Sequence, residues 1–182
     1  MDELVDILDF KGKKTGKTAL KSEAHKNGWF HQTTHIWFYT KKKEILLQQR
    51  SKNKDIFPLL WDVSVAGHIG AGEDIINSAL REIEEEIGIT IQKTDLQKIG
   101  CFKSIQKHTD YLIDCEFHHT FICKLKTDLN SLTKQDNEVE DLELKLISDF
   151  KIELSNIETK KLYVPHSKKY YNTVLAAIEK AF

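Results

Sequence analysis

An apolar periodicity between residues 74 and 87 constrains the fold of this chain more than any other feature. Apolar residues recur there at intervals of four, three and four, at Ile76, Leu80, Ile83 and Ile87. This spacing places them in one stripe along an α-helix, and Gly88 follows where a left-handed residue commonly ends a helix. The sequence therefore predicts an amphipathic helix over residues 74–87 that packs its stripe against another layer.

Segments rich in β-branched and aromatic residues surround this helix and predict strands. They span residues 29–40, 44–50, 60–66, 89–92, 96–105, 115–125 and 142–146. A second helix is expected over residues 168–182, with a packing face of Tyr171, Val174, Leu175 and Ile178. Because strands and helices do not alternate regularly, we expect an α+β fold, an α/β/α sandwich around a mixed β-sheet.

Composition favours one domain over residues 1–182, on which residues 1–28 pack as an N-terminal extension. Lys and Arg total 27 against 28 Asp and Glu, so the overall charge gives no reason to expect a nucleic-acid partner. The chain has no basic-then-apolar start and no apolar run approaching the roughly 18 residues that span a bilayer. We therefore expect no membrane partner and a cytoplasmic protein, with its three cysteines reduced.

The predicted helix carries an unusual cluster of acidic side chains. The run Arg81-Glu82-Ile83-Glu84-Glu85-Glu86 places three carboxylates, those of Glu82, Glu85 and Glu86, within an arc of roughly 100° opposite the apolar stripe. Carboxylates this close raise one another's pKa unless a cation lies among them, and Mg²⁺ prefers such oxygen ligands. A solvated acidic face is the alternative that charge alone leaves open.

Residues upstream of the acidic run favour the metal site. Together they read Gly67-x5-Glu73-x7-Arg81-Glu82-Ile83-x-Glu85-Glu86-x-Gly88-Ile89, which resembles the signature of the Nudix hydrolases over residues 67–89. The resemblance implies a loop–helix–loop in which Glu82, Glu85, Glu86 and the Gly67 carbonyl bind Mg²⁺, with Mn²⁺ as the alternative ion. It implies that Arg81 and Glu73 hold the loop and helix in place. The implied reaction is attack of water on a diphosphate joined to another group, X.

Residues 11–165 also resemble type I isopentenyl diphosphate isomerase and its hydrolase-like relatives. That resemblance implies a second divalent-metal site, whose counterparts here are His25, His31, His68, Asp114 and Glu116. It also implies that Lys21, Arg50 and Lys54 face the phosphates of a small-molecule diphosphate substrate. The histidines His35, His108, His118 and His119 gain no role from it.

Two departures favour hydrolysis over isomerisation. The isomerase has a proton-transferring cysteine where this chain has Ala66, and a tryptophan where this chain has His166. An isomerase with another proton donor and a non-catalytic nucleotide or metabolite sensor remain the alternatives. For the general base, Glu138 is the first candidate, with Glu140 and Glu116 as others, although a solvated acidic loop also explains residues 137–140. A homodimer is left open beside a monomer.

Overall fold

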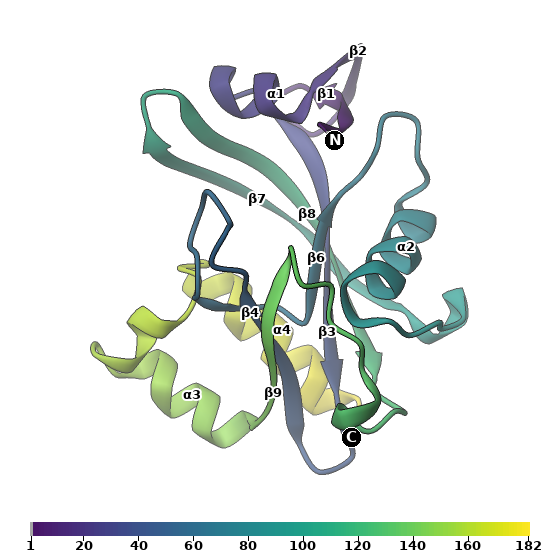
Figure 1. Cartoon of the computed structure of the whole chain (residues 1–182), viewed down its shortest axis with the longest axis vertical. Coiled ribbons are helices and arrows are strands. Elements are labelled where there is room, and N and C mark those ends of the chain that lie inside the picture. The colour runs from purple at the N-terminus through teal and green to yellow at the C-terminus, as the bar shows by residue number, and fades with distance from the viewer. Residues whose placement is uncertain (1) are drawn as a thin grey trace.

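The computed structural model of the chain describes residues 2–182 and contains a mixed sheet with helices on both faces (Figure 1). The strands are β1 (Leu4–Leu8), β2 (Lys14–Leu20), β3 (His31–Tyr39), β4 (Glu44–Arg50), β5 (Trp61–Asp62), β6 (Val65–His68), β7 (Gln97–Thr109), β8 (Leu112–Lys124) and β9 (Val139–Leu146). The helices are α1 (Lys21–Asn27), α2 (Ile75–Ile87), α3 (Ile147–Ser155) and α4 (Lys168–Lys180). Short 3₁₀ turns lie at Lys93–Asp95, Leu129–Ser131 and Thr159–Leu162.

The main sheet has seven strands, in the order β5-β4-β3-β8-β7, with β6 pairing with β3 and β9 with β4. Among the strands of the described residues, only β3 and β8 pair with each other in parallel, and an isolated parallel bridge joins Trp61 and Tyr163. Their register places His31 beside Glu116 and Thr33 beside His118. Because side chains on a strand alternate between faces, every second residue of these two central strands points toward the same side of the sheet.

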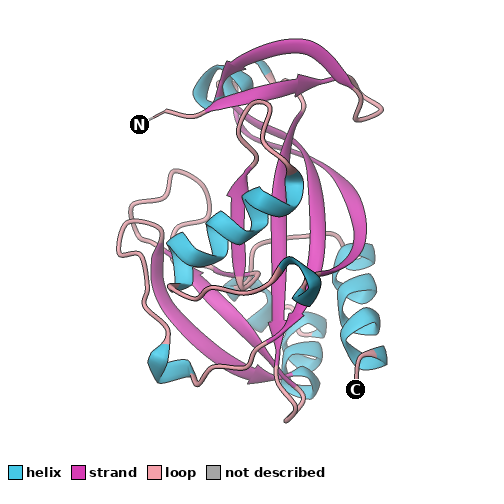
Figure 2. Ribbon diagram, turned by 90° about the vertical axis from the view of Figure 1, so that its right-hand side faces the viewer, coloured by secondary structure: helices cyan, strands magenta, loops and turns pink. Residues whose placement is uncertain are grey.

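The two faces of the sheet carry separate cores. Figure 2 shows α2 in front of the sheet and other helices behind it. On one face, Ile36 and Phe38 of β3 pack with Ile83 and Ile87 of α2. On the other, Trp37 packs with side chains of α3 and α4, among them Phe150, Tyr170 and Val174. The expected α/β/α sandwich is therefore confirmed.

The N-terminal segment forms a small two-stranded sheet, β1–β2, followed by α1 (Figure 1). It contacts the loop before α2: Val5 bridges Gly70, and the Ala71 amide donates to the Leu4 carbonyl at 2.8 Å. This packing brings α1 to the end of the central strands. None of the helices in residues 2–182 is long and apolar enough to cross a membrane.

The predicted elements agree with the structure in most places. Helix α2 starts after Asp74, whose side chain accepts from the amides of residues 76 and 77, and ends at Gly88 with φ of 70°. The strand predicted over residues 89–92 is wrong, because Ile89 and Ile91 pack onto the α2 core from a loop that pairs with no strand. The segment 60–66 is divided into β5 and β6, and α3 was not predicted.

Candidate active site

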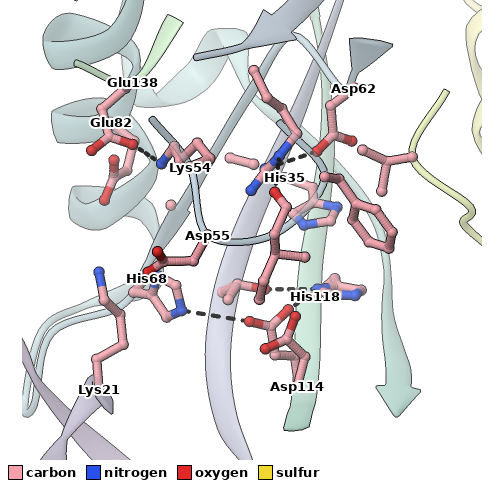
Figure 3. A pocket seen from close by; sticks show the side chains of 18 of the residues that line it. Lys21, His35, Lys54, Asp55, Asp62, His68, Glu82, Asp114, His118 and Glu138 are labelled. Atoms are coloured by element: carbon pink, nitrogen blue, oxygen red, sulfur yellow. Dashed lines mark hydrogen bonds and ion pairs between the residues drawn. The ribbon is translucent and has the colours of Figure 1, made fainter. Parts of the chain in front are cut away.

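The predicted site residues converge on one cavity of about 350 Å³ at the end of the sheet near α1 (Figure 3). Helices α1 and α2, strands β3, β6 and β8, the loop after β4 and the segment before α4 all contribute to its walls. The predicted residues that line it are Lys21, His25, Arg50, Lys54, Gly67, His68, Glu82, Glu85, Glu86, Asp114, Glu116 and Glu138. Three other predicted residues are not among those that line the cavity: Glu73, Arg81 and His31.

The Glu82 carboxylate occupies the space beside Gly67. A Cβ atom at position 67 would overlap the carboxylate carbon and both oxygens of Glu82, so only glycine allows α2 and β6 to approach this closely. Glu86, one turn along, accepts a hydrogen bond from the Ala66 amide at 3.1 Å. The helix thus presents its carboxylates directly to the backbone of β6.

Arg81 organises the acidic face from behind. One terminal nitrogen donates to Glu82 at 2.8 Å and to Glu85 at 2.9 Å, while the rest of the guanidinium bonds both oxygens of Glu73 at 3.1 Å. It also donates to the His68 carbonyl at 3.1 Å. These five contacts join the loop after β6 to α2. The holding role of Arg81 and Glu73 stays a prediction that these contacts are compatible with.

Because Glu82 and Glu86 are buried, their ionised forms are disfavoured when no cation is bound beside them. Burial raises the pKa of Glu82 to about 7, although Arg81 opposes the shift. For Glu86, burial and the neighbouring charge of Glu82 raise the pKa to about 8. A divalent cation bound between these groups would remove the penalty, since it favours the ionised form of its ligands.

A second group of ligand-type side chains lies at the α1 end of the cavity. Single ligand atoms of His25, His31, His68 and Glu116 all lie within 4.8 Å of one another. His31 donates from Nδ1 to the Trp29 carbonyl at 2.9 Å, which leaves its Nε2 lone pair directed at the group. Asp114 stands 3.7 Å from His25 and also bonds His108 at 3.0 Å.

This second group is incompletely satisfied by protein partners. His68 Nε2 and Asp114 Oδ1 are buried atoms that have no partner in hydrogen-bond geometry among the described residues. His68 Nε2 lies 3.5 Å from Glu116, and Asp114 Oδ1 lies 3.7 Å from His25. Burial lowers the pKa of His25 to about 4, with the neighbouring His68 adding to the shift. Burial alone would raise the pKa of Glu116, but contacts with His31 and His68 hold it well below its usual range. Burial alone would lower the pKa of His31, but Glu116 and the Trp29 carbonyl raise it, so a metal bound there would compete with a proton. Imidazoles around an ionised carboxylate are a donor set that suits a divalent metal.

Basic side chains also line the cavity. Lys21 is the first residue of α1, and Lys54 extends from the loop after β4 (Figure 3). Arg50 is held by Asp62 at 3.3 Å and by the Ile56 carbonyl at 3.0 Å. Lys54 forms an ion pair with Glu138, so this candidate base also reaches the cavity. Glu140 instead accepts from the Lys52 amide and does not line the cavity.

The sequence analysis missed one wall of the cavity, formed by His35, His118 and His166. The rings of His35 and His118 stack with centroids 4.1 Å apart, and His166 meets both edge-on. We name these three residues the histidine wall. A usable signal existed, because Glu116 and His118 are two residues apart on β8 and must share a face.

The positions that separate this chain from the isomerase also line the cavity. Ala66 precedes Gly67 and carries no transferable proton, and His166 follows Pro165. His166 bonds Asp62 at 2.8 Å. Burial alone would raise the pKa of Asp62, but this bond and the charge of Arg50 hold it well below its usual range.

The family of this chain follows from its similarity to known proteins. The NUDIX domain family matches residues 29–164, so the chain belongs to the Nudix family. An uncharacterised Nudix hydrolase of Clostridium acetobutylicum is 35% identical over 203 residues, which cover 97% of each chain. Nudix hydrolase 3 of Arabidopsis thaliana is 35% identical over 142 residues, covering 76% of this chain and 18% of the plant protein.

The isomerase resemblance is also present at lower coverage. Isopentenyl-diphosphate Delta-isomerase of Serratia proteamaculans is 30% identical over 122 residues, covering 67% of this chain and 66% of the isomerase. Among solved structures, DR0079 from Deinococcus radiodurans shares the fold, with a TM-score of 0.67, 16% identity and coverage of 88% of this chain and 97% of that one. The Nudix domain of Shewanella oneidensis NrtR, solved with ADP ribose, has a TM-score of 0.53, 15% identity and coverage of 71% and 85%.

Proposed function

We propose that this chain is a Mg²⁺-dependent hydrolase that cleaves a diphosphate linkage in a nucleotide or another small organic diphosphate. The observation that carries the proposal is the position of the Glu82, Glu85 and Glu86 side chains, which line a cavity beside a glycine that Glu82 requires. A solvated acidic face would not bury Glu82 and Glu86, whose side chains are mostly withdrawn from solvent.

The residues present fit a hard divalent cation. Two buried carboxylates with raised pKa values, and a third that is exposed beside them, offer the oxygen ligands that Mg²⁺ or Mn²⁺ takes. When bound, such an ion neutralises phosphate oxygens and lowers the pKa of a coordinated water. Glu82 and Glu86 would hold it from α2, and the Gly67 carbonyl would complete the set.

The remaining cavity residues suit phosphate binding and proton transfer. Lys21, Arg50 and Lys54 would bind the diphosphate oxygens and orient the phosphorus for attack in line with the leaving group. Substrate phosphates would compete with Glu138 for the Lys54 ammonium. The released Glu138 carboxylate could then accept the proton of the attacking water.

The second group, His25, His31, His68, Asp114 and Glu116, is proposed to hold another divalent metal. Its support is the pair of buried atoms without hydrogen-bond partners and the short distances among its ligand atoms. Imidazole ligands favour Mn²⁺, Co²⁺ or Zn²⁺ over Mg²⁺, so the two sites would differ in preferred ion. The cytoplasmic location and the homodimer remain predictions.

Isomerase activity is the second candidate, favoured by the relative from Serratia proteamaculans. The alanine at position 66 argues against it, because isomerisation moves a proton at carbon and a methyl side chain cannot supply one. Incubation with isopentenyl diphosphate in heavy water separates the two activities. Deuterium in an allylic product without phosphate release would overturn hydrolysis in favour of isomerisation.

A Mg²⁺-dependent screen tests the main proposal. Its substrates are dinucleoside polyphosphates, nucleotide sugars, coenzyme A, ADP-ribose, oxidised nucleotides and prenyl diphosphates. Glu86→Gln should abolish turnover of any substrate found, whereas Glu84→Gln on the exposed side of α2 should leave it unchanged. Binding without turnover by the wild-type protein across the screen would support the metabolite sensor instead.

A further inference from the structure

The histidine wall has a hydrogen-bonding pattern that the metal and phosphate sites do not use. Each of its three rings bonds the protein through one nitrogen. His35 Nδ1 meets the Tyr170 hydroxyl at 2.8 Å, His118 Nδ1 meets the Thr33 hydroxyl at 2.7 Å, and His166 Nε2 meets Asp62 at 2.8 Å. The other nitrogen of each ring has no hydrogen-bond partner among residues 2–182.

The free nitrogens are open to the cavity. All three histidines line it, and none of their free nitrogens is among the sealed polar atoms of the described chain, which are Thr34 Oγ1, His68 Nε2 and Asp114 Oδ1. Water can bond these accessible nitrogens while the cavity is empty, but a ligand that fills the cavity displaces that water and must replace its hydrogen bonds. Three such nitrogens on one wall therefore favour a polar ligand.

The free nitrogen of His35 offers a hydrogen bond to the cavity in either tautomer. The indole of Trp37 can only donate, and it lies 2.9 Å from the Tyr170 hydroxyl, which accepts from it. If the hydroxyl directs its own proton to His35 Nδ1, the His35 ring carries its hydrogen on Nε2 and presents a donor; if His35 Nδ1 donates to the hydroxyl, Nε2 accepts.

The geometry of the rings argues against a stacking site for a flat base. His35 and His118 lie 20° from parallel and cover one face of each other, so they offer nitrogen-bearing edges to the cavity. The charges behind the wall are also compensated, because Asp62 is paired with both Arg50 and His166. The wall consequently suits a neutral group that both donates and accepts hydrogen bonds.

Resting on the proposed diphosphate hydrolysis, we infer that the histidine wall binds the group X, and that X is a compact, neutral, hydroxylated group of the polyol or sugar type. Its position supports this assignment. Asp62 connects the wall to Arg50 of the phosphate-binding residues, and Glu116 lies 3.4 Å from His118. A hydrocarbon X would leave the three nitrogens unpaired, and that desolvation penalty selects against it.

A matched pair of non-cleavable ligands tests the inference. The probes are propyl methylenediphosphonate and its 2,3-dihydroxypropyl counterpart, which differ only in two hydroxyls, with methylenediphosphonate as the reference. Binding to the full chain is measured by calorimetry with Mg²⁺ present. We expect the dihydroxypropyl ester to bind about tenfold more tightly than the propyl ester, since two hydrogen bonds are gained.

Variants of the wall locate the preference. His35→Phe keeps a flat ring but removes both ring nitrogens. It should reduce the preference for the dihydroxypropyl ester over the propyl ester to below about threefold, and leave the affinity for the propyl ester unchanged. Thr33→Val removes the hydroxyl that orients the His118 ring through Nδ1, so it should also reduce the preference for the dihydroxypropyl ester. This variant decides the question if His35→Phe does not fold. His119→Phe is the matched control, because His119 bonds Gln32 on the other face of β8 and does not line the cavity.

The outcomes separate this inference from the proposed function. Equal affinities or a propyl preference in the wild-type protein would overturn the inference. A preference for the dihydroxypropyl ester that persists in both His35→Phe and Thr33→Val would also overturn the inference. If methylenediphosphonate binds but neither ester does, the wall assignment fails and diphosphate binding stands. If none of the three ligands binds, both proposals fail.

Discussion

The Glu82 carboxylate lies against Gly67, in the space that a side chain at that position would fill. Gly67→Ala should therefore push α2 away from β6 and lower kcat/KM by about 100-fold or more, because small displacements of catalytic groups are costly. Mg²⁺-dependent turnover and Mg²⁺ binding by calorimetry are the measurements.

Gly70 supplies the control for that substitution. It lies in the same segment, and a Cβ there would meet only the flexible end of Glu73, at 3.3 Å. Gly70→Ala should keep most of the activity. Equal losses in the two variants would show that the segment, and not the Gly67–Glu82 approach, is what matters.

The raised pKa values of Glu82 and Glu86 predict a pH dependence of stability in the metal-free protein. Each folded-state value, about 7 and about 8, lies above the ordinary 4.5, so the folded chain binds more protons than the unfolded chain between these limits. The contribution of the pair to the free energy of unfolding therefore falls as pH rises from 4.5 to 8, by up to about 1.4 kcal/mol per pH unit for each group.

Urea unfolding with chelator measures this effect as the difference between the wild-type protein and the Glu82→Gln, Glu86→Gln double variant. Because the histidines are present in both proteins, their contribution to the pH dependence cancels in this difference. Mg²⁺ should offset the loss at high pH, because the metal binds the deprotonated carboxylates. A difference that stays constant from pH 5 to pH 8 would contradict the burial of these two groups.

The pairing of Lys54 with Glu138 predicts distinct effects for two neighbouring glutamates. Glu138→Gln should lower kcat by about 100-fold to 10,000-fold if this carboxylate accepts the proton of water. Glu140→Gln should change kcat little, since Glu140 lies outside the cavity. Steady-state kinetics on the best substrate of the screen distinguishes them, and similar kcat values for the two variants would remove Glu138 from the mechanism.

The histidine-rich metal group predicts a second binding event. The chain should bind a further equivalent of Mn²⁺, Co²⁺ or Zn²⁺, and His31→Phe should weaken that event by at least about tenfold. The absorption bands of bound Co²⁺ report it directly. His119→Phe is again the control, and unchanged Co²⁺ spectra in His31→Phe would place the metal elsewhere.

The N-cap of α2 predicts a stability change without a catalytic one. Asp74 accepts from the Ile76 and Asn77 amides at 3.0 and 3.1 Å, and both bonds are lost in Asp74→Ala. The free energy of unfolding should fall by about 1 kcal/mol. Chemical denaturation measures it, with Asp74→Asn, which keeps an accepting oxygen, as the control that should lose much less.

Local patterns in the sequence predicted the elements that depend on local spacing. The α2 stripe and the Gly88 end lie within one segment, so apolar periodicity and the terminal glycine were sufficient, whereas the cap at Asp74 was not predicted. The same reasoning failed at residues 89–92, where Ile89 and Ile91 are apolar because they cover α2 and not because they pair as a strand. Helix α3 was overlooked although Ile147, Phe150 and Leu154 have helical spacing.

The candidate site was predictable only where a family resemblance or a local motif contained it. The acidic face and the metal histidines were found in this way, whereas His35 and His118 were set aside as histidines without a role. Their importance depends on the parallel register of β3 with β8, which brings together residues 85 positions apart, such as Thr33 and His118. The residue pattern of either strand alone does not predict this register.

That parallel pairing also bears on the order in which the protein acquires its structure. Helix α2 needs only neighbouring residues, but β3 must wait for β8 and close a loop of some 85 residues before their ladder can form. Contacts between distant segments slow folding, because the entropy of closing the loop is lost before the pairing compensates for it. A folding chain should therefore display the three α2 carboxylates early, and bring Glu116 and His118 to the histidines of β3 in its last steps.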